Sequence, residues 1–420
     1  MDESERLEAG DYQDAFALLA EMTQGFAGGL DLHGTLERAL ASMAAHVGAA
    51  AGSLWIVENA GAQVECAASV GTNPITGLRL PVSEGIVGKC VRENACQNVL
   101  DVSSDPHFSQ KMDAQSGFVT RSILCSPMSV SDQVFGAVEL INKSSADGRF
   151  AGADAHLLRV LTSSAGLAIA NARLNAAQVE NERVRRELEL AAEIQRNLLP
   201  TAQGAGFPAS GVNVPARMVS GDFYDFLPLA SGKIAFCLGD VAGKGMNAAL
   251  LMAKTASLYR LLAKDASCPG DLLARLNDEI CETTTRGMFV TMAAGIYDPT
   301  CGDIALANAG HEPPLYAAAD GSFESFPADA PPLGIVPDSD FPEIGIEMRR
   351  GSLYLCSDGL TEAPCAGEAL GQKGFQRLIE RFAAKPLGER IDAIVAAVGE
   401  CELHDDLTLL GVSDEGRPGR

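Results

Sequence analysis

The stretch KIAFCLGDVAGKGMNAALLMAK (233–254) decides the architecture of the C-terminal half of the chain. It begins with a continuous apolar run, 234–238, whose length and composition predict a buried strand. Asp240 follows at the end of that strand, and glycines and other small residues then leave open space around it. Apolar residues at helical spacing come next and predict a helix over 247–264. A buried strand therefore presents a carboxylate at a turn.

Three further aspartates stand at comparable junctions between apolar runs and turns: Asp222, Asp358 and Asp405. Their contexts are SGDFYDF (220–226), LYLCSDGLTEA (353–363) and HDDLTLLGV (404–412). Any one of them alone is better explained as a turn residue, because Asp next to Gly is a common turn signal. Together with Asp240 they are oxygen ligands that suit Mn²⁺ or Mg²⁺, and two such ions can clamp a phosphoryl group and ionise a water molecule. The four aspartates therefore predict a shared metal centre.

The rest of this half consists of strand-like and helical segments in blocks. Strand-like segments follow one another more often than they enclose single helices, which favours a layered α+β sandwich over a doubly wound sheet. Further helices are expected over 270–284, 375–384 and 388–400. A Gly- and Pro-containing stretch at 201–211 indicates a domain boundary, so we expect a C-terminal domain over 201–414.

The N-terminal half predicts a smaller domain over 13–175, with several strands between an early helix and a closing helix. A charged helical linker over 176–200 then joins the two domains. Its residues at alternating steps of four and three suit the seam of a coiled coil: Ala177, Asn181, Val184, Leu188, Ala191, Gln195 and Leu198. This spacing favours a parallel homodimer, and a single linker helix packed on one of its own domains is the alternative.

The composition limits the partners and the location. The chain has 420 residues, 47% of them hydrophobic, and a formal net charge of −23 at pH 7. That charge argues against nucleic acid and against an anionic membrane as partners. No apolar run approaches the roughly 18 residues of a membrane span, and the acidic N-terminus is unlike a signal peptide. Eleven cysteines without a C-x-x-C pair suit a reducing compartment, so we expect a cytoplasmic protein.

The first domain resembles a GAF domain, a small sensory fold with one antiparallel sheet flanked by helices. The matching words are LRLPVSEGIVGKCVRENACQNVLDV (78–102) and VFGAVELINKSSADGRF (134–150). The resemblance implies a small-molecule ligand, and some members bind cyclic nucleotides through an Asn-Lys, Phe and acidic pattern. That pattern is met here by Asn142, Lys143, Phe150 and Asp154, whereas Ala155 replaces a second acidic residue. The alternative is that these residues only cap the last strand and the closing helix.

The second domain resembles the SpoIIE-type members of the PPM family, the metal-dependent serine/threonine protein phosphatases. The pattern words occur in order between residues 194 and 412: IQRNLLP, PARMVSGDFYDF, GDVAGKGMNAALLMA, MFVTM, ANAGHEPPL, LYLCSDGLTEA and HDDLTLL. The resemblance implies an α-β-β-α sandwich with two metal ions. It implies that Asp240 bridges the ions, that Asp222 serves one ion, and that Asp358 and Asp405 serve the other. The residue after the bridging aspartate, Val241, would contribute its backbone carbonyl.

The resemblance also implies a mechanism and a role. Water ionised between the two ions would attack the phosphorus of a phosphoserine or phosphothreonine directly. The expected substrate is a phosphorylated protein, a small anti-sigma-factor antagonist, and the GAF domain would regulate the phosphatase through a dimeric helical linker. A degenerate scaffold protein is the competing interpretation, and the retention of all four aspartates counts against it.

Several residues near these motifs have less certain roles. Asp225 and Asp406 are candidates for weaker ligands, and Arg217 is a candidate contact for the phosphate. His311 could act as a general acid, or it could hold its loop against the turn at Asn308. A fifth residue, His404, is expected to orient a loop.

The Gly-Lys-Gly turn at 243–245 suggests a phosphate-binding loop at first sight. The spacing of a nucleotide-hydrolase loop is absent, however, because Met246 follows and no glycine stands five places earlier. We therefore interpret this turn as the entry to the helix over 247–264.

Overall fold

The structure is a computed structural model that describes residues 32–58, 61–72, 74–108, 113, 118–201, 206–283, 287–365, 368–399 and 405–415. By contacts along the chain it divides into two units, Met1–Glu182 and Arg183–Arg420. The first residues of the expected domain over 13–175, and His404, lie outside the described residues.

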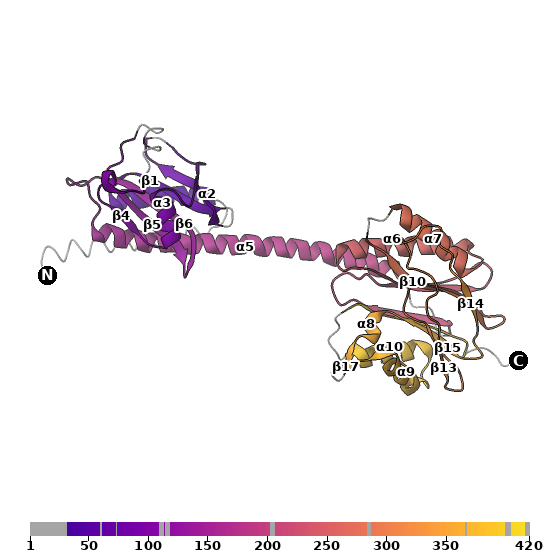
Figure 1. Cartoon of the computed structure of the whole chain (residues 1–420). Coiled ribbons are helices and arrows are strands. Elements are labelled where there is room, and N and C mark those ends of the chain that lie inside the picture. Colours follow the sequence, from indigo (N-terminus) through magenta and orange to yellow (C-terminus); the bar gives the residue numbers. More distant parts are fainter. Residues whose placement is uncertain are drawn as a thin grey trace. The chain divides into compact units, whose positions relative to one another are not determined.

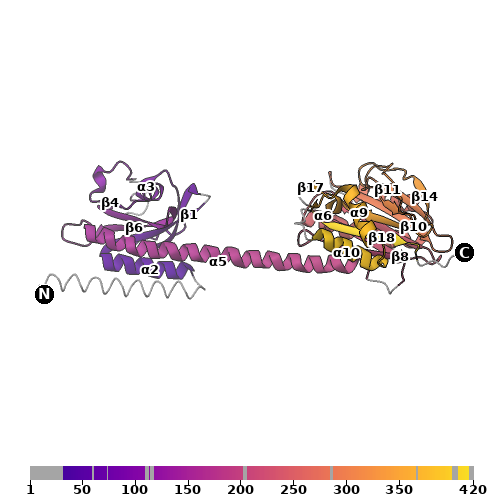
Figure 2. The same ribbon diagram turned by 90° about the horizontal axis from the view of Figure 1, so that it is seen from below.

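The first unit is built on one antiparallel sheet of six strands in the order β3-β2-β1-β6-β5-β4 (Figure 1). The strands are β1 (Ala49–Glu58), β2 (Gln63–Val70), β3 (Arg79–Pro81), β4 (Gln97–Val99), β5 (Ile123–Val130) and β6 (Gln133–Lys143). Helix α2 (Leu32–Val47) and the first turns of α5 (Gly152–Leu198) cover one face of the sheet and share a core with it (Figure 2). Helix α3 (Gly85–Glu93) covers the other face, where Trp55 is buried.

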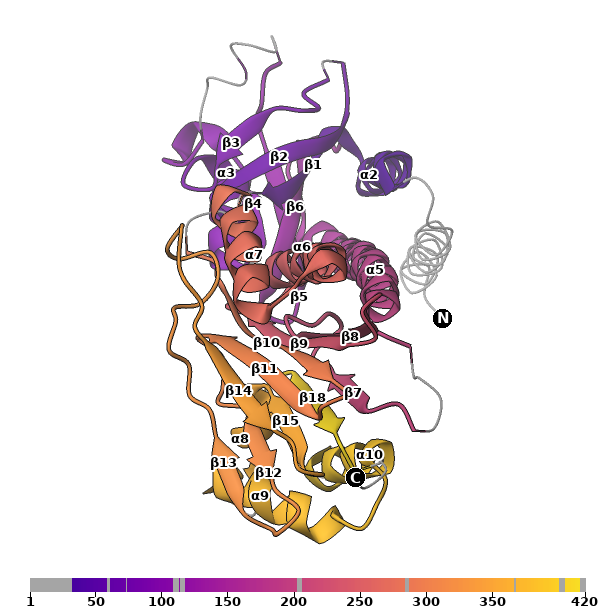
Figure 3. The same ribbon diagram turned by 90° about the vertical axis from the view of Figure 1, so that its right-hand side faces the viewer.

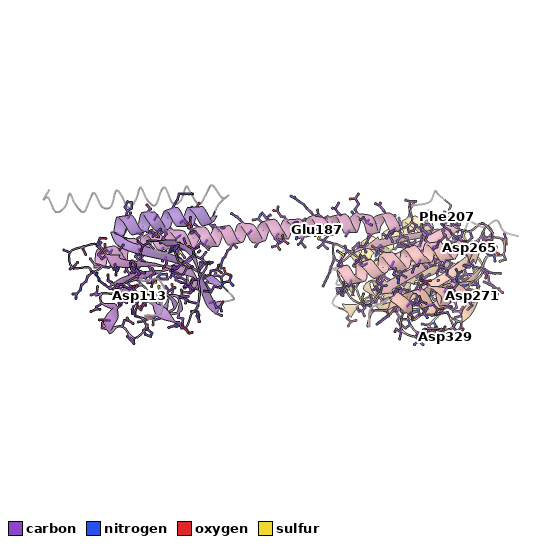
Figure 4. The ribbon with its side chains drawn as sticks, turned by 90° about the horizontal axis from the view of Figure 1, so that it is seen from above. Asp113, Glu187, Phe207, Asp265, Asp271 and Asp329 are labelled. Carbon is purple, nitrogen blue, oxygen red and sulfur yellow. The ribbon has the colours of Figure 1, made fainter. Side chains whose placement is uncertain are left out.

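Helix α5 is continuous, so the expected closing helix and the expected linker form one element. Its middle carries charged side chains such as Glu187, which projects from the helix (Figure 4). Pairs of Arg and Glu four residues apart, Arg183–Glu187 and Arg185–Glu189, support the helix locally.

The second unit is a sandwich of two antiparallel sheets of five strands each, in the orders β14-β11-β10-β9-β8 and β13-β12-β15-β18-β7 (Figure 3). The first sheet contains β8 (Phe223–Pro228), β9 (Ile234–Val241), β10 (Val290–Asp298), β11 (Asp303–Ala309) and β14 (Glu343–Glu347). The second contains β7 (Ala209–Val214), β12 (Leu315–Ala317), β13 (Phe323–Ser325), β15 (Ser352–Cys356) and β18 (Leu407–Ser413). Alternate side chains of both sheets, such as Phe236 and Leu410, fill the space between them.

Helices cover the two outer faces of this sandwich. Helices α6 (Met246–Leu262) and α7 (Pro269–Thr283) pack on the first sheet, and α9 (Gly371–Phe382) and α10 (Leu387–Gly399) pack on the second. The short helix α8 (Asp358–Thr361) directly follows β15, and a two-stranded hairpin, β16 (Pro364–Cys365) and β17 (Glu368–Ala369), comes after it. The layered α+β class predicted from the sequence is confirmed. Among the described residues, no helix is both long and apolar enough to span a bilayer.

Candidate metal centre

The four aspartates come from strand ends at one end of the two-sheet sandwich. Asp222 immediately precedes β8, and Asp240 is the penultimate residue of β9, which pairs with β8. Asp358 begins α8 after β15, and Asp405 lies just before β18, which pairs with β15. Because the paired strands are antiparallel, the start of one lies beside the end of the other. A hydrogen bond of 2.7 Å from Thr408 Oγ1 of β18 to Asp222 Oδ2 links the two sheets at this end.

Burial and the repulsion between neighbouring acids disfavour the charged form of Asp222, Asp240 and Asp358. Asp222 is only 2% exposed, and burial, followed by the charge of Asp240, raises its pKa well above the ordinary value. Burial also raises the pKa of Asp240 to about 6, with Asp358 and Asp405 adding repulsion and a hydrogen bond with Asp222 opposing the shift. The pKa of Asp358 is raised by burial and then by Asp405 and Glu362. A positive charge bound among them would relieve both effects.

A basic side chain already approaches the cluster. Lys244 Nζ lies 2.7 Å from Asp405 Oδ2 in a half-exposed ion pair. Both residues, together with Asp240 and Arg217, line a small cavity of about 20 Å³. The turn at 243–245 therefore serves the acidic cluster, and Arg217 lies where it could contact an anion held there.

The donor set fits a hard divalent cation, although the ligands are not preassembled. Among the residues the structure describes, no three carboxylate, imidazole or thiol side chains converge as a ready-made metal site. The chemistry of the donors is nevertheless right, since carboxylate and carbonyl oxygens are what Mg²⁺ and Mn²⁺ prefer. At Gly221 a Cβ atom would lie 3.4 Å from the Val241 carbonyl oxygen and 3.8 Å from Asp240 Oδ1. These two oxygens therefore border the same small space.

Two neighbouring acids, Asp406 and Asp225, make hydrogen bonds or ion pairs that support the fold. Asp406 accepts hydrogen bonds of 2.8 Å from Ala216 N, Ser220 Oγ and Gly221 N, and so fixes the loop that leads to Asp222. Asp225 lies three residues beyond Asp222 on β8, where alternation turns it to the opposite face of the sheet. There it forms an ion pair with Arg260 of α6. Asp225 therefore faces away from the cluster, whereas Asp406 also lines the small cavity beside Asp240 and Asp405 and stays a candidate for a weaker ligand.

His311 is buried behind the cluster and is unsuited to general-acid catalysis. It is 4% exposed, and its Nδ1 lies 2.9 Å from Thr291 Oγ1. Burial lowers the pKa of His311 to about 4, opposed only by the nearby main chain of Cys356. The ring is therefore neutral at pH 7. The alternative interpretation, a loop held against Asn308, agrees with the hydrogen bond of 2.9 Å from His311 N to Asn308 Oδ1.

The prediction that Gln195 belongs to a coiled-coil seam is wrong. Its side chain is 7% exposed and is bonded inside the second unit. Its Nε2 donates to the carbonyls of Ser220 and Ala249, and its Oε1 accepts from Ser220 N at 3.1 Å. The end of α5 is thereby fixed to α6 and to the loop before Asp222. The glutamine itself could have indicated this, because an amide buried in an apolar seam would lack the polar partners that it needs.

In the first unit, the Asn-Lys, Phe and acidic pattern has a structural role. Asn142 Oδ1 accepts from the backbone N–H groups of Arg121 and Ser122. Lys143 Nζ donates to Asp154 Oδ1 at 2.8 Å and to the Val47 carbonyl. These bonds tie β6 to α5 and α2, as the capping alternative predicted.

A separate cavity of about 280 Å³ lies in the first unit between β1, β2, β6 and the start of α3. Its lining is largely apolar, and the charged side chains among its described lining residues are all acidic: Glu84, Asp113 and Glu139. Asp113 is marked in Figure 4. Glu139 accepts from Ser53 Oγ at 3.3 Å, and burial raises the pKa of its carboxyl group to about 7.

Known proteins resemble both units. Residues 230–413 match the family model described as Stage II sporulation protein E (SpoIIE), and residues 31–169 match the GAF domain. The phosphoserine phosphatase RsbU of Bacillus subtilis is 30% identical over 236 residues, which cover 54% of this chain and 70% of that protein. Protein IcfG of Synechocystis sp. is 30% identical over 278 residues, covering 57% of this chain but only 43% of its own length.

The fold of the second unit also occurs in a solved structure. The SiaA-PP2C domain of Pseudomonas aeruginosa aligns with 56% of this chain and 98% of its own chain, with a TM-score of 0.50. Because the sequence identity is 22%, this likeness concerns the fold alone.

Proposed function

The chain belongs to the SpoIIE-type PPM serine/threonine phosphatases and carries a GAF domain, and from this premise we propose that it dephosphorylates a protein with a centre of two Mn²⁺ or Mg²⁺ ions. The observation that carries the proposal is that Asp222, Asp240, Asp358 and Asp405 all stand at strand ends at one end of the sandwich, with the pKa values of the first three raised. Carboxylates gathered in this number favour multivalent cations.

Each residue has a distinct task in this proposal. Asp240 would be shared by the two ions, Asp222 would hold one of them, and Asp358 and Asp405 would hold the other, with the carbonyl of Val241 as a further ligand. When bound, such ions ionise a water molecule and neutralise phosphoryl charge. Thr408 orients Asp222 through its 2.7 Å hydrogen bond. Arg217, which lines the small cavity, would bind a phosphoryl oxygen.

The experiment is hydrolysis of p-nitrophenyl phosphate by the full chain as Mn²⁺ is varied. Wild type is expected to depend on Mn²⁺, and Asp240→Ala and Asp358→Ala are expected to lose nearly all activity. Asp265→Ala is a matched control, because Asp265 is an exposed residue beyond the end of α6 (Figure 4). Activity that survives Asp240→Ala would contradict the two-metal proposal.

The proposed substrate is a small phosphorylated anti-sigma-factor antagonist in the cytoplasm. The support is the relation to a protein named as a phosphoserine phosphatase, together with a net charge that disfavours nucleic acid and anionic membranes. Release of phosphate from a phosphorylated antagonist domain, measured beside an unrelated phosphoprotein, tests this choice. Equal rates on the two proteins would contradict it.

We further propose that a homodimer formed through α5 regulates the phosphatase. Val184 of the predicted seam is 42% exposed. Leu167 and Leu174, which continue the same spacing toward the start of α5, are 51% and 68% exposed. Gln195 connects the end of the same helix to the loop before Asp222. Sedimentation of wild type and Leu174→Glu tests the dimer, and a monomeric wild type would contradict it.

The acidic cavity of the GAF domain suggests the kind of ligand that would control this regulation. Glu139, Asp113 and Glu84 offer acceptors, and the described lining has no Lys or Arg to balance a phosphate. We propose a compact, mostly apolar ligand with an N–H edge that binds Glu139. Calorimetry with benzamidine and with cyclic GMP, on wild type and Glu139→Gln, distinguishes the outcomes. Binding of both probes unaffected by Glu139→Gln would contradict this assignment.

A further inference from the structure

His311 occupies a position that the backbone fixes on both sides. It follows Gly310, whose φ of +66° and contact with Pro332 suit only glycine. The side chain of Asn308 then holds the main chain of His311, accepting from its N–H at 2.9 Å and donating to its carbonyl at 3.2 Å. The main chain of His311 is therefore held by the end of β11, without help from the acidic cluster.

The ring lies between β10, which pairs with the strand that carries Asp240, and the end of β15, which precedes Asp358. On one side, Nδ1 is 2.9 Å from Thr291 Oγ1 of β10. Thr291 is directly opposite Asp240 in the β9–β10 pair, and its hydroxyl lies 3.4 Å from the Asp240 carbonyl oxygen. On the other side, the ring is close to the main chain of Cys356, two residues before Asp358. One buried ring thus spans the gap between the two sheets.

We propose that His311, acting through Thr291, is a positioning residue that sets the separation of Asp240 and Asp358 and thereby the affinity for the divalent cation. The two aspartates belong to different sheets, so no backbone hydrogen bond between neighbouring strands fixes their distance. A neutral ring in a buried gap supplies a rigid spacer with one hydrogen bond. This inference rests on the proposed metal centre. Groups that orient metal ligands commonly change metal affinity by about 10- to 100-fold when they are removed.

The test compares Thr291→Val, which removes the hydroxyl at nearly constant volume, with Thr291→Ser, which keeps it. Titration calorimetry of the full chain should show that Thr291→Val binds Mn²⁺ at least about 10-fold more weakly than wild type. The same reasoning applies to His311→Ala. Thr291→Ser should stay within about threefold of wild type, since the hydrogen bond is retained. Saturating Mn²⁺ should restore most of the kcat of Thr291→Val, which loss of a proton donor would not allow.

Different results would overturn different statements. If wild type binds Mn²⁺ and Thr291→Val binds it equally well, the positioning role is wrong while the metal centre stands. The same holds if His311→Ala lowers only the melting temperature of the metal-free protein. If wild type binds no Mn²⁺, the proposed function fails and this inference fails with it. The Thr291 pair decides the matter even if His311→Ala does not fold.

Discussion

Buried carboxylates gather in two regions of this chain, and the regions differ in what could neutralise them. In the GAF cavity, Glu139 is buried with Ser53 as its hydrogen-bond partner, and a single proton or a single N–H donor would satisfy it. At the end of the phosphatase sandwich, Asp222, Asp240 and Asp358 repel one another, and one proton cannot satisfy them all. By the number of its acids, the first region suits a small organic ligand and the second suits multivalent cations.

The comparison also concerns stability. An acid whose pKa is raised on folding makes the charged protein less stable, and such strain is often retained because function requires it. If the metal-centre acids are kept for function, removing one should harm catalysis and help folding. An acid kept for the fold should behave in the opposite way.

The largest expected effect is on catalysis by Asp240→Asn. Loss of the proposed bridging ligand should lower Mn²⁺-dependent kcat at least about 1,000-fold. In the metal-free protein, removing the repelled charge should raise the free energy of unfolding at pH 7.5 by about 1–3 kcal/mol, at roughly 1.4 kcal/mol per pKa unit. Activity assays and urea unfolding with EDTA measure the two effects. A variant that loses both activity and stability would show that Asp240 supports the fold.

The next largest effect is expected on the pH dependence of the stability of the GAF domain. The folded pKa of Glu139, about 7, exceeds its ordinary value of 4.5, so the folded state binds the proton more tightly. The resulting stabilisation is fully present below pH 4.5 and is lost as pH rises through 7, by up to about 3 kcal/mol. Glu139→Gln should remove this dependence. Urea unfolding followed by Trp55 fluorescence gives the free energy of unfolding at pH 5 and at pH 8. If this free energy changed equally between the two pH values in wild type and in Glu139→Gln, the burial of a titrating acid would be contradicted.

Mn²⁺ should stabilise the phosphatase sandwich rather than the GAF domain. At 100 times its dissociation constant, a bound ion stabilises the folded state by about 2.7 kcal/mol, or roughly 5–10 °C in a unit of this size. Asp358→Asn should abolish most of this shift, whereas Glu139→Gln should leave it intact. Differential scanning calorimetry with Mn²⁺ and with EDTA provides the measurement. A shift that Glu139→Gln removes would place the cation in the GAF cavity instead.

Sequence patterns were sufficient for the α+β class and for the strand ends that deliver the four aspartates, because both follow from local apolar periodicity. They could not assign partners that are distant in the chain. Ser220 meets Asp406 across 186 positions, and Thr408 meets Asp222 across the same separation. Gln195 was misassigned for the same reason, since its heptad position is local but its partners belong to the phosphatase sandwich.

The smallest expected effect comes from Asp414→Asn, made at the opposite end of the strand that follows Asp405. Asp414 comes directly after β18 and is buried, and its Oδ1 accepts a hydrogen bond of 2.6 Å from Tyr297 Oη. Its Oδ2 also accepts a hydrogen bond of 3.3 Å from Arg350 N. An amide has only one acceptor oxygen, so asparagine keeps one of these two bonds, and the loss should be about 1–2 kcal/mol. Urea unfolding should therefore show a decrease, opposite in sign to that of Asp240→Asn, while Mn²⁺ affinity and kcat stay within about twofold of wild type. The same Asp-to-Asn change would then separate an acid that stabilises the sandwich from one that destabilises it. If both substitutions shifted stability in the same direction, burial alone would account for the two acids, and the distinction between fold and metal centre would have to be abandoned.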